Sequence, residues 1–314
     1  MRNALAVIAF GGNAILKEDE RGTQEEQIRH TDEACDLMAQ IVQRGYDLIL
    51  VHGNGPQVGN ILIQMEEAVN KVPPFSLDVC VAISEGSMGY MLERSLRNQF
   101  RKRNIRKEVT CLITQVMVDP RDPAFENPSK PIGPFFTAYR AAALRKEKKW
   151  PMIEDSGRGY RRVVASPMPQ RIINLEIVKT LVKEAICVIA AGGGGIPAYY
   201  DGHDNIKGVE AVIDKDHTSS LLAAELKADL FVILTNVECV YIHYGKKSQR
   251  PLARVRLKEM KRYYERGQFP PGSMGPKIKA AIDFIESGGK EVLITSSKEL
   301  MRALRGQSGT RIVR

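Results

Sequence analysis

The chain is poor in long apolar runs and in aromatic residues. No stretch approaches the roughly 20 consecutive apolar residues of a transmembrane helix, so we expect no membrane span. Aromatic residues make up 6% of the sequence. The basic stretch at residues 97–107 contains one aromatic residue, Phe100, and lacks the repeated interleaving of aromatic and basic residues that is typical of RNA-binding motifs. We interpret that stretch as a solvated helix end, with nucleic-acid binding as the minor alternative, and expect no nucleic-acid partner.

Closely spaced cysteines are also absent. The sequence has five cysteines and no CxxC pair, which argues against a zinc-binding or disulfide framework. Cys111, Cys187 and Cys239 follow or lie within apolar runs, and we expect them to be small core residues.

The apolar run at residues 4–10 is too short to span a bilayer and lacks the features of a signal peptide. A reducing cytoplasm is therefore the expected location.

Two common nucleotide-binding motifs are missing. The sequence contains no GxxxxGK(S/T), which excludes a P-loop enzyme. Residues 53–59 read GxGxxxG, which differs by one residue from the dinucleotide-binding fingerprint. A nicotinamide-dependent dehydrogenase is therefore disfavoured.

The sequence does contain enough apolar residues for a core, together with an excess of basic residues. Hydrophobic residues make up 43% of the 314 residues and charged residues 26%, as in folded soluble proteins. Lysine and arginine number 46 against 37 acidic residues, which gives a net charge of +9. This excess suits an enzyme that handles anions such as phosphates, although it would also suit a nucleic acid or an acidic surface.

Short apolar runs without alternation recur along the chain and predict buried strands. These runs cover residues 4–10, 47–51, 109–118, 186–191, 230–234 and 291–295. Helical patterns lie between them, at residues 25–44, 219–227 and 276–287. The alternation predicts an α/β fold in which helices cover both faces of a mainly parallel sheet, a three-layer α/β/α sandwich.

Residues 119–166 interrupt this alternation with six prolines and many charged residues. The segment is too long for an ordinary connection between two elements. A disordered insertion is one interpretation. We favour a small protruding lid, because Ile132, Phe135, Phe136, Trp150 and Tyr160 could form a core of its own. Lids over phosphoryl-transfer sites exclude water and complete the site.

Four glycine-rich turns lie at residues 11–14, 53–59, 192–195 and 272–277. The first three follow predicted strands, and the fourth leads into a predicted helix. Glycine lets backbone N–H groups approach an oxyanion closely, and a helix N-terminus adds a favourable dipole. Ligands of open α/β sheets bind at the carboxyl ends of the strands, so we expect the first three turns to share a site.

Three lysines have unusual surroundings. Lys130 lies between two prolines, and Lys277 lies in the first turn of a predicted helix. A cation there opposes the helix dipole, which makes sense if an anion binds beside it. Lys215 lies in the triplet Asp214-Lys215-Asp216. The triplet is either a solvated helix cap with Asp216 in the first turn, or a site in which Lys215 faces a phosphate and Asp214 orients the lysines.

Given these motifs, the sequence resembles the amino-acid kinase family over essentially its whole length, and within it the carbamate kinases. The matching segments are AFGGNAIL (9–16), HGNGPQVG (52–59), DPAFENPSKPIGPF (122–135), EDSGRGYRRVV (154–164), AGGGGIP (191–197), GVEAVIDKD (208–216) and FPPGSMGPK (269–277). NPSKPIGPF and GRGYRRVV are the most specific, because they are similar to the protruding subdomain of the carbamate kinases. Most other family members carry a lysine on the first strand. The resemblance implies that Lys130 takes over its role here.

The resemblance also implies roles for individual residues. Lys130, Lys215 and Lys277 would neutralise the transferred phosphoryl group, and Asp214 would organise them. The residues that would bind the substrate are Gly11, Gly12, Asn13, Gly53, Asn54 and Gly55. The residues that would hold the nucleotide are Thr235, Asn236, Val237, Tyr241, Tyr244, Gly272, Ser273 and Met274.

The activity implied by the resemblance is reversible phosphoryl transfer between ATP and carbamate, giving ADP and carbamoyl phosphate. Mg²⁺ would enter with the nucleotide, and we expect no metal site made by the protein alone. Carbamate is already an oxyanion, so positioning and electrostatic stabilisation can suffice without a general base. The resemblance further implies the ATP-forming direction, in arginine or related nitrogen catabolism, and a homodimer. Residues 1–185 would bind carbamate and carry the lid at about 119–166, and residues 186–314 would bind the nucleotide.

The sequence departs from the family pattern at a few positions. Asn236 stands where the family usually has Asp, and Glu85 stands where Gln is common. Two alternatives therefore stay open. One is another phosphotransferase of the same family. The other is a nucleotide-binding paralogue without turnover, for which Asn236 is the best indication.

Overall fold

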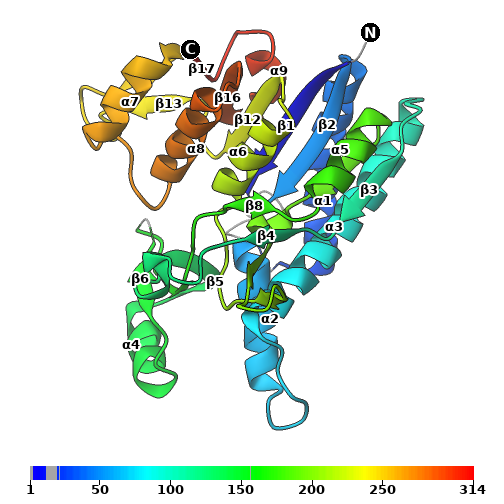
Figure 1. Cartoon of the computed structure of the whole chain (residues 1–314). Coiled ribbons are helices and arrows are strands. Elements are labelled where there is room, and N and C mark those ends of the chain that lie inside the picture. Colours follow the sequence, from blue (N-terminus) through cyan, green and yellow to red (C-terminus); the bar gives the residue numbers. More distant parts are fainter. Residues whose placement is uncertain (1–2, 12–19, 21, 156) are drawn as a thin grey trace.

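A central sheet organises the computed structural model, which describes residues 3–11, 20, 22–155 and 157–314. Its strands are β1 (Ala4–Phe10), β2 (Tyr46–His52), β3 (Val109–Leu112), β9 (Cys187–Ala190), β12 (Leu230–Thr235), β15 (Arg254–Arg256), β16 (Glu291–Ser296) and β17 (Thr310–Val313). They lie in the order β15-β17-β16-β12-β1-β2-β9-β3 (Figure 1). Neighbouring strands run parallel except β16 and β17, which are antiparallel. The mainly parallel sheet is as predicted.

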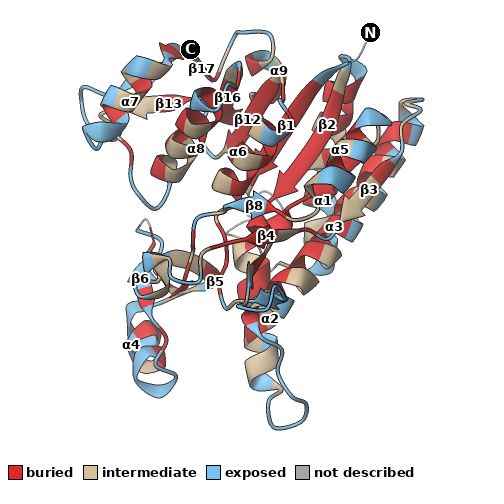
Figure 2. Cartoon of the chain, viewed as in Figure 1, coloured by how far each residue is buried: buried red, intermediate tan, exposed pale blue. Residues whose placement is uncertain are grey.

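Both faces of this sheet are buried because its central strands carry apolar side chains at successive positions. In β1, Val7 and Ala9 point into one core and Ile8 and Phe10 into the other. Figure 2 shows these strands as buried, whereas the outer surfaces of the surrounding helices are exposed. A strand that alternates between two apolar environments shows no polar alternation in its sequence, which is why the apolar runs predicted it.

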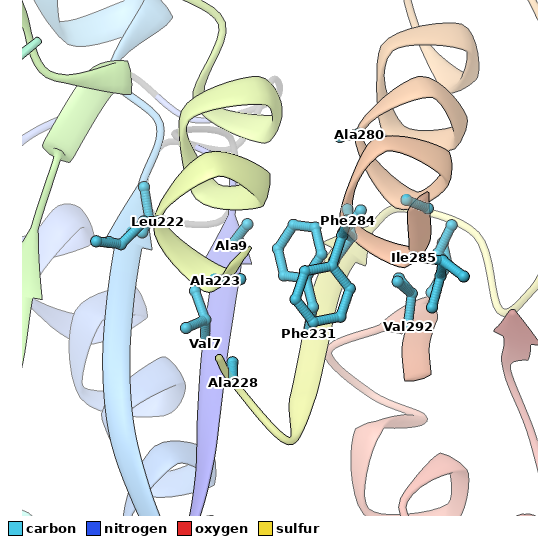
Figure 3. Close-up of a cluster of buried hydrophobic side chains, with 14 of the residues drawn as sticks. Val7, Ala9, Leu222, Ala223, Ala228, Phe231, Ala280, Phe284, Ile285 and Val292 are labelled. Carbon is cyan, nitrogen blue, oxygen red and sulfur yellow. The ribbon is translucent and has the colours of Figure 1, made fainter. Parts of the chain in front are cut away.

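Helices cover the two faces of the sheet. One face carries α1 (Gln24–Gln43), α3 (Leu77–Lys102) and α9 (Leu300–Ala303). The other carries α5 (Leu175–Lys183), α6 (Lys215–Glu225), α7 (Leu257–Glu265) and α8 (Met274–Glu286). Figure 3 shows the second core, in which the rings of Phe231 in β12 and Phe284 in α8 meet edge to face with centroids 5.5 Å apart. The three-layer α/β/α architecture is confirmed.

Some predicted element boundaries are wrong. The run at 109–118 is not one strand, because the chain leaves the main sheet after β3 and continues as β4 (Gln115–Met117). β4 belongs to a smaller sheet with β8 (Arg171–Ile172), β10 (Ile196–Tyr200) and β11 (Ile206–Gly208). α6 begins at Lys215, four residues before its predicted start. The Asp214 carboxylate accepts a hydrogen bond from the Asp216 N–H at 2.9 Å and caps the helix there. α8 begins two residues early, at Met274.

The segment predicted as a lid is ordered and projects away from the main sheet (Figure 1). It contains β5 (Lys130–Phe136), α4 (Ala138–Glu147), β6 (Met152–Glu154) and β7 (Tyr160–Val164), with the strands in the order β5-β7-β6. α2 (Gly55–Glu67) packs against β5. The remaining pair of strands is β13 (Val240–Ile242) and β14 (Arg250–Leu252).

The core of this segment differs in part from the prediction. Trp150 is buried there, with Phe136 and Tyr160 packed against it, as expected. Ile132 instead joins a cluster that includes side chains of α2 and α3. Phe135 is not part of the core, because two arginine guanidinium groups lie over its ring.

Among the described residues, no helix is long and apolar enough to cross a bilayer.

Candidate active site

A cavity of about 360 Å³ lies where β1, β2, β9 and β12 end. Gly11 follows β1, Gly53 follows β2, Gly193 lies in the turn after β9, and Thr235 ends β12; all four residues line the cavity. The four strands are parallel, so their carboxyl ends lie at one edge of the sheet. One residue of each of the first three glycine turns, Gly11, Gly53 and Gly193, therefore lines the same cavity; residues 12–14 of the first turn lie outside the described residues.

The turn after β2 is held in place by its neighbours. The Gly53 N–H donates to the Phe10 carbonyl at 2.8 Å, which ties this turn to the end of β1. The Asn54 side chain is buried and donates from Nδ2 to Ser84 Oγ at 2.8 Å. Gly55 is the first residue of α2 and also lines the cavity. Gly12 and Asn13, also predicted to bind substrate, lie outside the described residues.

The three predicted lysines converge on this cavity from three elements. Lys130 begins β5 of the lid, Lys215 begins α6, and Lys277 lies in the first turn of α8. Lys130 Nζ lies 2.5 Å from Asp214 Oδ2. Asp216 serves both other lysines, with Oδ1 at 2.5 Å from Lys215 Nζ and Oδ2 at 3.1 Å from Lys277 Nζ. Two carboxylates therefore space three ammonium groups around one cavity.

Burial and the lysines act in opposite directions on the two carboxylates. Burial alone would raise the pKa of Asp214, but the positive charges of Lys130 and Lys215 outweigh it and hold that pKa well below its usual range. The pKa of Asp216 is lowered in the same way, with Lys215 and Lys277 outweighing burial. Both carboxylates are thus ionised at neutral pH.

The pKa values of Lys215 and Lys277 shift in opposite directions. Burial lowers the pKa of Lys215, even though Asp216 favours its charged form. For Lys277, Asp216 and Asp214 outweigh the effect of burial and raise the pKa. An incoming anion would therefore favour the charged form of Lys215.

The predicted nucleotide-binding residues lie along the same cavity. Thr235, Asn236 and Val237 continue from the end of β12. The rings of Tyr241 and Tyr244 lie 6.0 Å apart. The cavity is also lined by Gly272, Ser273 and Met274, which lead into α8. The structure thus groups all of these residues with the three lysines.

Several lining residues were missed from the sequence. Asp216 was interpreted either as a solvated cap or as part of a triplet with no role of its own, yet it is 2% exposed. Asp155, Arg158 and Arg161 of the lid also line the cavity. Arg161 Nε donates to the Gly133 carbonyl at 3.0 Å, and its Nη1 lies 3.2 Å from Asp155 Oδ2. With Asp214 and the three lysines, these residues bring five cationic and three anionic side chains to one cavity, and this excess of positive charge favours an anionic ligand.

Comparison with known proteins gives this site a context. The model of the amino acid kinase family matches residues 4–296. The carbamate kinase of Pyrococcus horikoshii is 46% identical over 308 residues, which cover 98% of either chain. That of Thermococcus kodakarensis is 47% identical over 311 residues, again 98% of either chain.

Solved structures agree. Carbamate kinase from Giardia lamblia bound to citric acid superposes with a TM-score of 0.94 at 40% identity, covering 99% of this chain and 98% of that one. The same enzyme bound to AMP-PNP gives a TM-score of 0.89 at 41% identity, with the same coverage. A UMP kinase from Bacillus anthracis, at 14% identity and a TM-score of 0.56, shares only the fold. The chain therefore belongs to the amino acid kinase family and, within it, to the carbamate kinases.

Proposed function

We propose that the cavity transfers a phosphoryl group between ATP and carbamate, giving ADP and carbamoyl phosphate. The observation that carries this proposal is the convergence of Lys130, Lys215 and Lys277 beside glycine turns at the ends of parallel strands. A transferred phosphoryl group spreads negative charge over its oxygens. Its transfer needs positioned positive charge more than covalent help from the protein.

The lysines are arranged to serve such a group. An ammonium group has three N–H donors. Lys130 gives one to Asp214, Lys215 one to Asp216, and Lys277 bonds to Asp216 and the Ser273 carbonyl. The remaining donors can bind phosphoryl oxygens while the carboxylates keep the ammonium groups in place. We assign Gly11, Gly12, Asn13 and the turn at 53–55 to carbamate and the phosphoryl group.

We assign the other end of the cavity to ATP or ADP. The strip at 235–237, the two tyrosines at 241 and 244, and the turn at 272–274 would hold the nucleotide. The Giardia enzyme that superposes on this chain was solved with AMP-PNP, which supports a nucleotide in this fold. In this assignment residues 1–185 bind carbamate and residues 186–314 bind the nucleotide.

Mg²⁺ fits this site as a companion of the nucleotide. The described residues contain no group of three or more His, Cys, Asp or Glu side chains that could hold a metal ion. Asp214 and Asp216 line the cavity and would be available to contact it, and both are paired with lysines. When bound, Mg²⁺ neutralises phosphate charge and is coordinated mainly by phosphate oxygens and water. We further propose a cytoplasmic homodimer that runs toward ATP in arginine or related nitrogen catabolism.

The lid lysine gives the sharpest test. We expect Lys130→Ala to lower the rate of ATP formation from carbamoyl phosphate and MgADP about 100- to 1,000-fold, because a positioned charge on the phosphoryl group is lost. Its thermal midpoint should fall only moderately, because Lys215 still neutralises Asp214 after the loss of Lys130.

The matched control is Lys148→Ala. Lys148 belongs to the same lid segment but contacts Glu66 and Glu67 outside the cavity, so its replacement should leave the rate unchanged. A near-normal rate for Lys130→Ala would remove its assigned role. Nucleotide binding without any ATP formation by the unaltered protein would instead favour the non-catalytic paralogue suggested by Asn236.

A further inference from the structure

Two adjacent residues of α3, Ser84 and Glu85, lie beneath the substrate side of the cavity. Their exposed fractions are 0% and 1%. Neither lines the cavity, but each bonds to a turn that does. Burying a carboxyl group costs folding free energy unless its hydrogen bonds are made. The hydrogen-bond partners of Glu85 therefore indicate its role.

Ser84 holds the turn that contains Asn54. Its Oγ accepts the bond from Asn54 Nδ2 at 2.8 Å and donates to the Val81 carbonyl at 2.7 Å. The hydroxyl is thus oriented by its own helix. As a result, the side chain of Asn54, a residue that lines the cavity, is anchored to α3.

Glu85 holds the turn that contains Gly192. Its Oε1 accepts from the Gly192 N–H at 2.9 Å, and its Oε2 accepts from the Thr114 N–H at 3.2 Å. Thr114 Oγ1 in turn accepts from the Ala191 N–H at 2.9 Å. The start of the turn that carries Gly193 to the cavity is therefore held from two sides.

The two turns leave no room between them. A Cβ atom on Gly193 would lie 2.1 Å from Asn54 Nδ2. A Cβ atom on Gly192 would lie 2.2 Å from His52 Nε2 and 3.0 Å from Glu85 Cγ. A shift of either turn would therefore push directly on the other.

We propose that Ser84 and Glu85 are positioning residues for phosphoryl transfer, which set the spacing between the turn at 53–55, assigned to the anionic substrate, and the neighbouring turn at 192–195. This inference rests on the proposed function. The proposed role of Glu85 also offers a physical reason for Glu at position 85, where Gln is common in the family. A carboxyl group, neutral or ionised, offers an oxygen to each of the two N–H groups, whereas an amide can offer one oxygen and turns its NH₂ toward the other N–H.

The carboxyl group makes this arrangement sensitive to pH. Burial raises the pKa of Glu85 to about 8, outweighing its bonds to Thr114 and Gly192. The titratable groups that face it are His52 of β2 and Cys111 of β3. Burial lowers the pKa of His52 to about 4 and raises that of Cys111 to about 12, so both stay neutral from about pH 6 to 9. As the pH rises through about 8, Glu85 ionises and becomes the better acceptor for both N–H groups.

The test compares Glu85→Gln with Glu93→Gln. Glu93 is a matched control, because it lies in the same helix and its Oε2 accepts from the Cys111 N–H at 2.8 Å, but it is outside the cavity. We expect Glu85→Gln to raise the KM for carbamoyl phosphate about tenfold while the KM for ADP stays within about twofold. The unaltered protein should show a fall in the KM for carbamoyl phosphate as the pH rises through about 8, and Glu85→Gln should abolish it. Equal kinetic constants for the two variants, or equal effects of Glu85→Gln on both substrates, would overturn the proposal.

Two further measurements keep the outcome decisive. If Glu85→Gln does not fold, Ser84→Ala replaces it and should also raise the KM for carbamoyl phosphate alone. If the unaltered protein forms no ATP from carbamoyl phosphate, the proposed function fails. The positioning role is then judged by amide hydrogen exchange at residues 190–197. Faster exchange in Glu85→Gln than in Glu93→Gln supports the role, and equal exchange contradicts it.

Discussion

Asp216 shows how a single carboxylate can organise a charged site. It lies between Lys215 and Lys277, which come from different helices, and only 3% of its side chain is exposed. Two ammonium groups this close would repel each other strongly in a poorly solvated cavity. The carboxylate removes that repulsion while leaving room for an anion, so the same residue stabilises the fold and prepares the site.

Replacing Asp216 with Asn should therefore destabilise the protein. We expect the free energy of unfolding to fall by about 3–5 kcal/mol, because both lysines lose their buried counter-charge. Sulfate should restore part of the loss by binding between the two ammonium groups. Urea unfolding with and without sulfate measures both effects.

Asp283→Asn is the control for that experiment. Asp283 pairs with Lys279 on the outer part of α8, where both side chains are more exposed, so its loss should cost at most about 0.5 kcal/mol. Equal costs for Asp216→Asn and Asp283→Asn would contradict the role given to Asp216.

The sequence patterns predicted a role in the site for the three lysines, but not for the Asp216 carboxylate. Lys130 and Lys277 were conspicuous because a proline frame and a helix N-terminus are odd places for idle cations. Asp216 had an ordinary explanation as a helix cap. Its burial arises because α6 packs on α8, where Ser220 Oγ donates to the Ala280 carbonyl at 2.8 Å. That contact joins residues 60 positions apart, which local patterns cannot reveal.

At the scale of elements, the lid is positioned by close contact between two backbones. A Cβ atom on Gly59 of α2 would lie 2.0 Å from the Gly133 nitrogen of β5. Gly133 itself has φ of +72°, a conformation that favours glycine. Further out, Arg162 of β7 pairs with Glu66 of α2 at 2.7 Å. The lid strand that begins with Lys130 is thus seated directly on α2.

Gly59→Ala should consequently disturb the lid. The added methyl group meets backbone atoms, so β5 must shift, and Lys130 shifts with it. We expect the rate of ATP formation to fall about 100-fold, since misplacement by about 1 Å is enough for such a loss. The affinity for ADP, measured by calorimetry, should stay within about twofold.

Gly86→Ala provides the comparison within a helix. The nearest atom to a Cβ there is Ile113 Cδ1 at 3.7 Å, an ordinary contact, so this change should leave the rate unchanged and stabilise α3 by up to about 1 kcal/mol. A normal rate for Gly59→Ala would show that the seating of β5 does not position Lys130.

Elements that are apolar throughout were the easiest to predict. β1, β2, β12 and β16 match their predicted ranges within a residue at either end. The division of 109–118 into β3 and β4 was not predictable, because both halves are apolar. The chain turns where the Thr114 N–H bonds to Glu85 of α3, a contact between distant segments. The lid core was predicted only in part, since Ile132 packs on α2 instead of within the lid.

At the scale of the whole molecule, buried titratable groups set how stability depends on pH. His52 is fully buried, and burial lowers its pKa from 6.5 to about 4. His52 is therefore protonated near pH 6.5 in the unfolded chain, but only near pH 4 in the folded protein. Stability from this group is present above pH 6.5 and is lost as the pH falls toward 4, by roughly 3 kcal/mol in total.

His52→Asn should flatten this acid dependence. Glu85 acts in the opposite sense, because its raised pKa makes stability fall as the pH rises from about 4.5 to 8, so the variant is compared with the unaltered protein at each pH. Urea unfolding at pH 7.5 and 4.5 should show a smaller loss on acidification for His52→Asn than for the unaltered protein. His203→Asn, at an exposed position, should show the full loss. Identical losses in both variants would contradict the assignment to His52.

The fold, the cavity and the family together indicate that this protein exchanges a phosphoryl group between carbamoyl phosphate and ADP. The most direct measurement is the initial rate of ATP formation from MgADP with carbamoyl phosphate and, separately, with acetyl phosphate. We expect rapid ATP formation from carbamoyl phosphate and a rate on the order of 100-fold lower from acetyl phosphate, whose methyl group cannot replace the hydrogen bonds of the amino group. Equal rates with the two acyl phosphates, or no ATP from either, would contradict it.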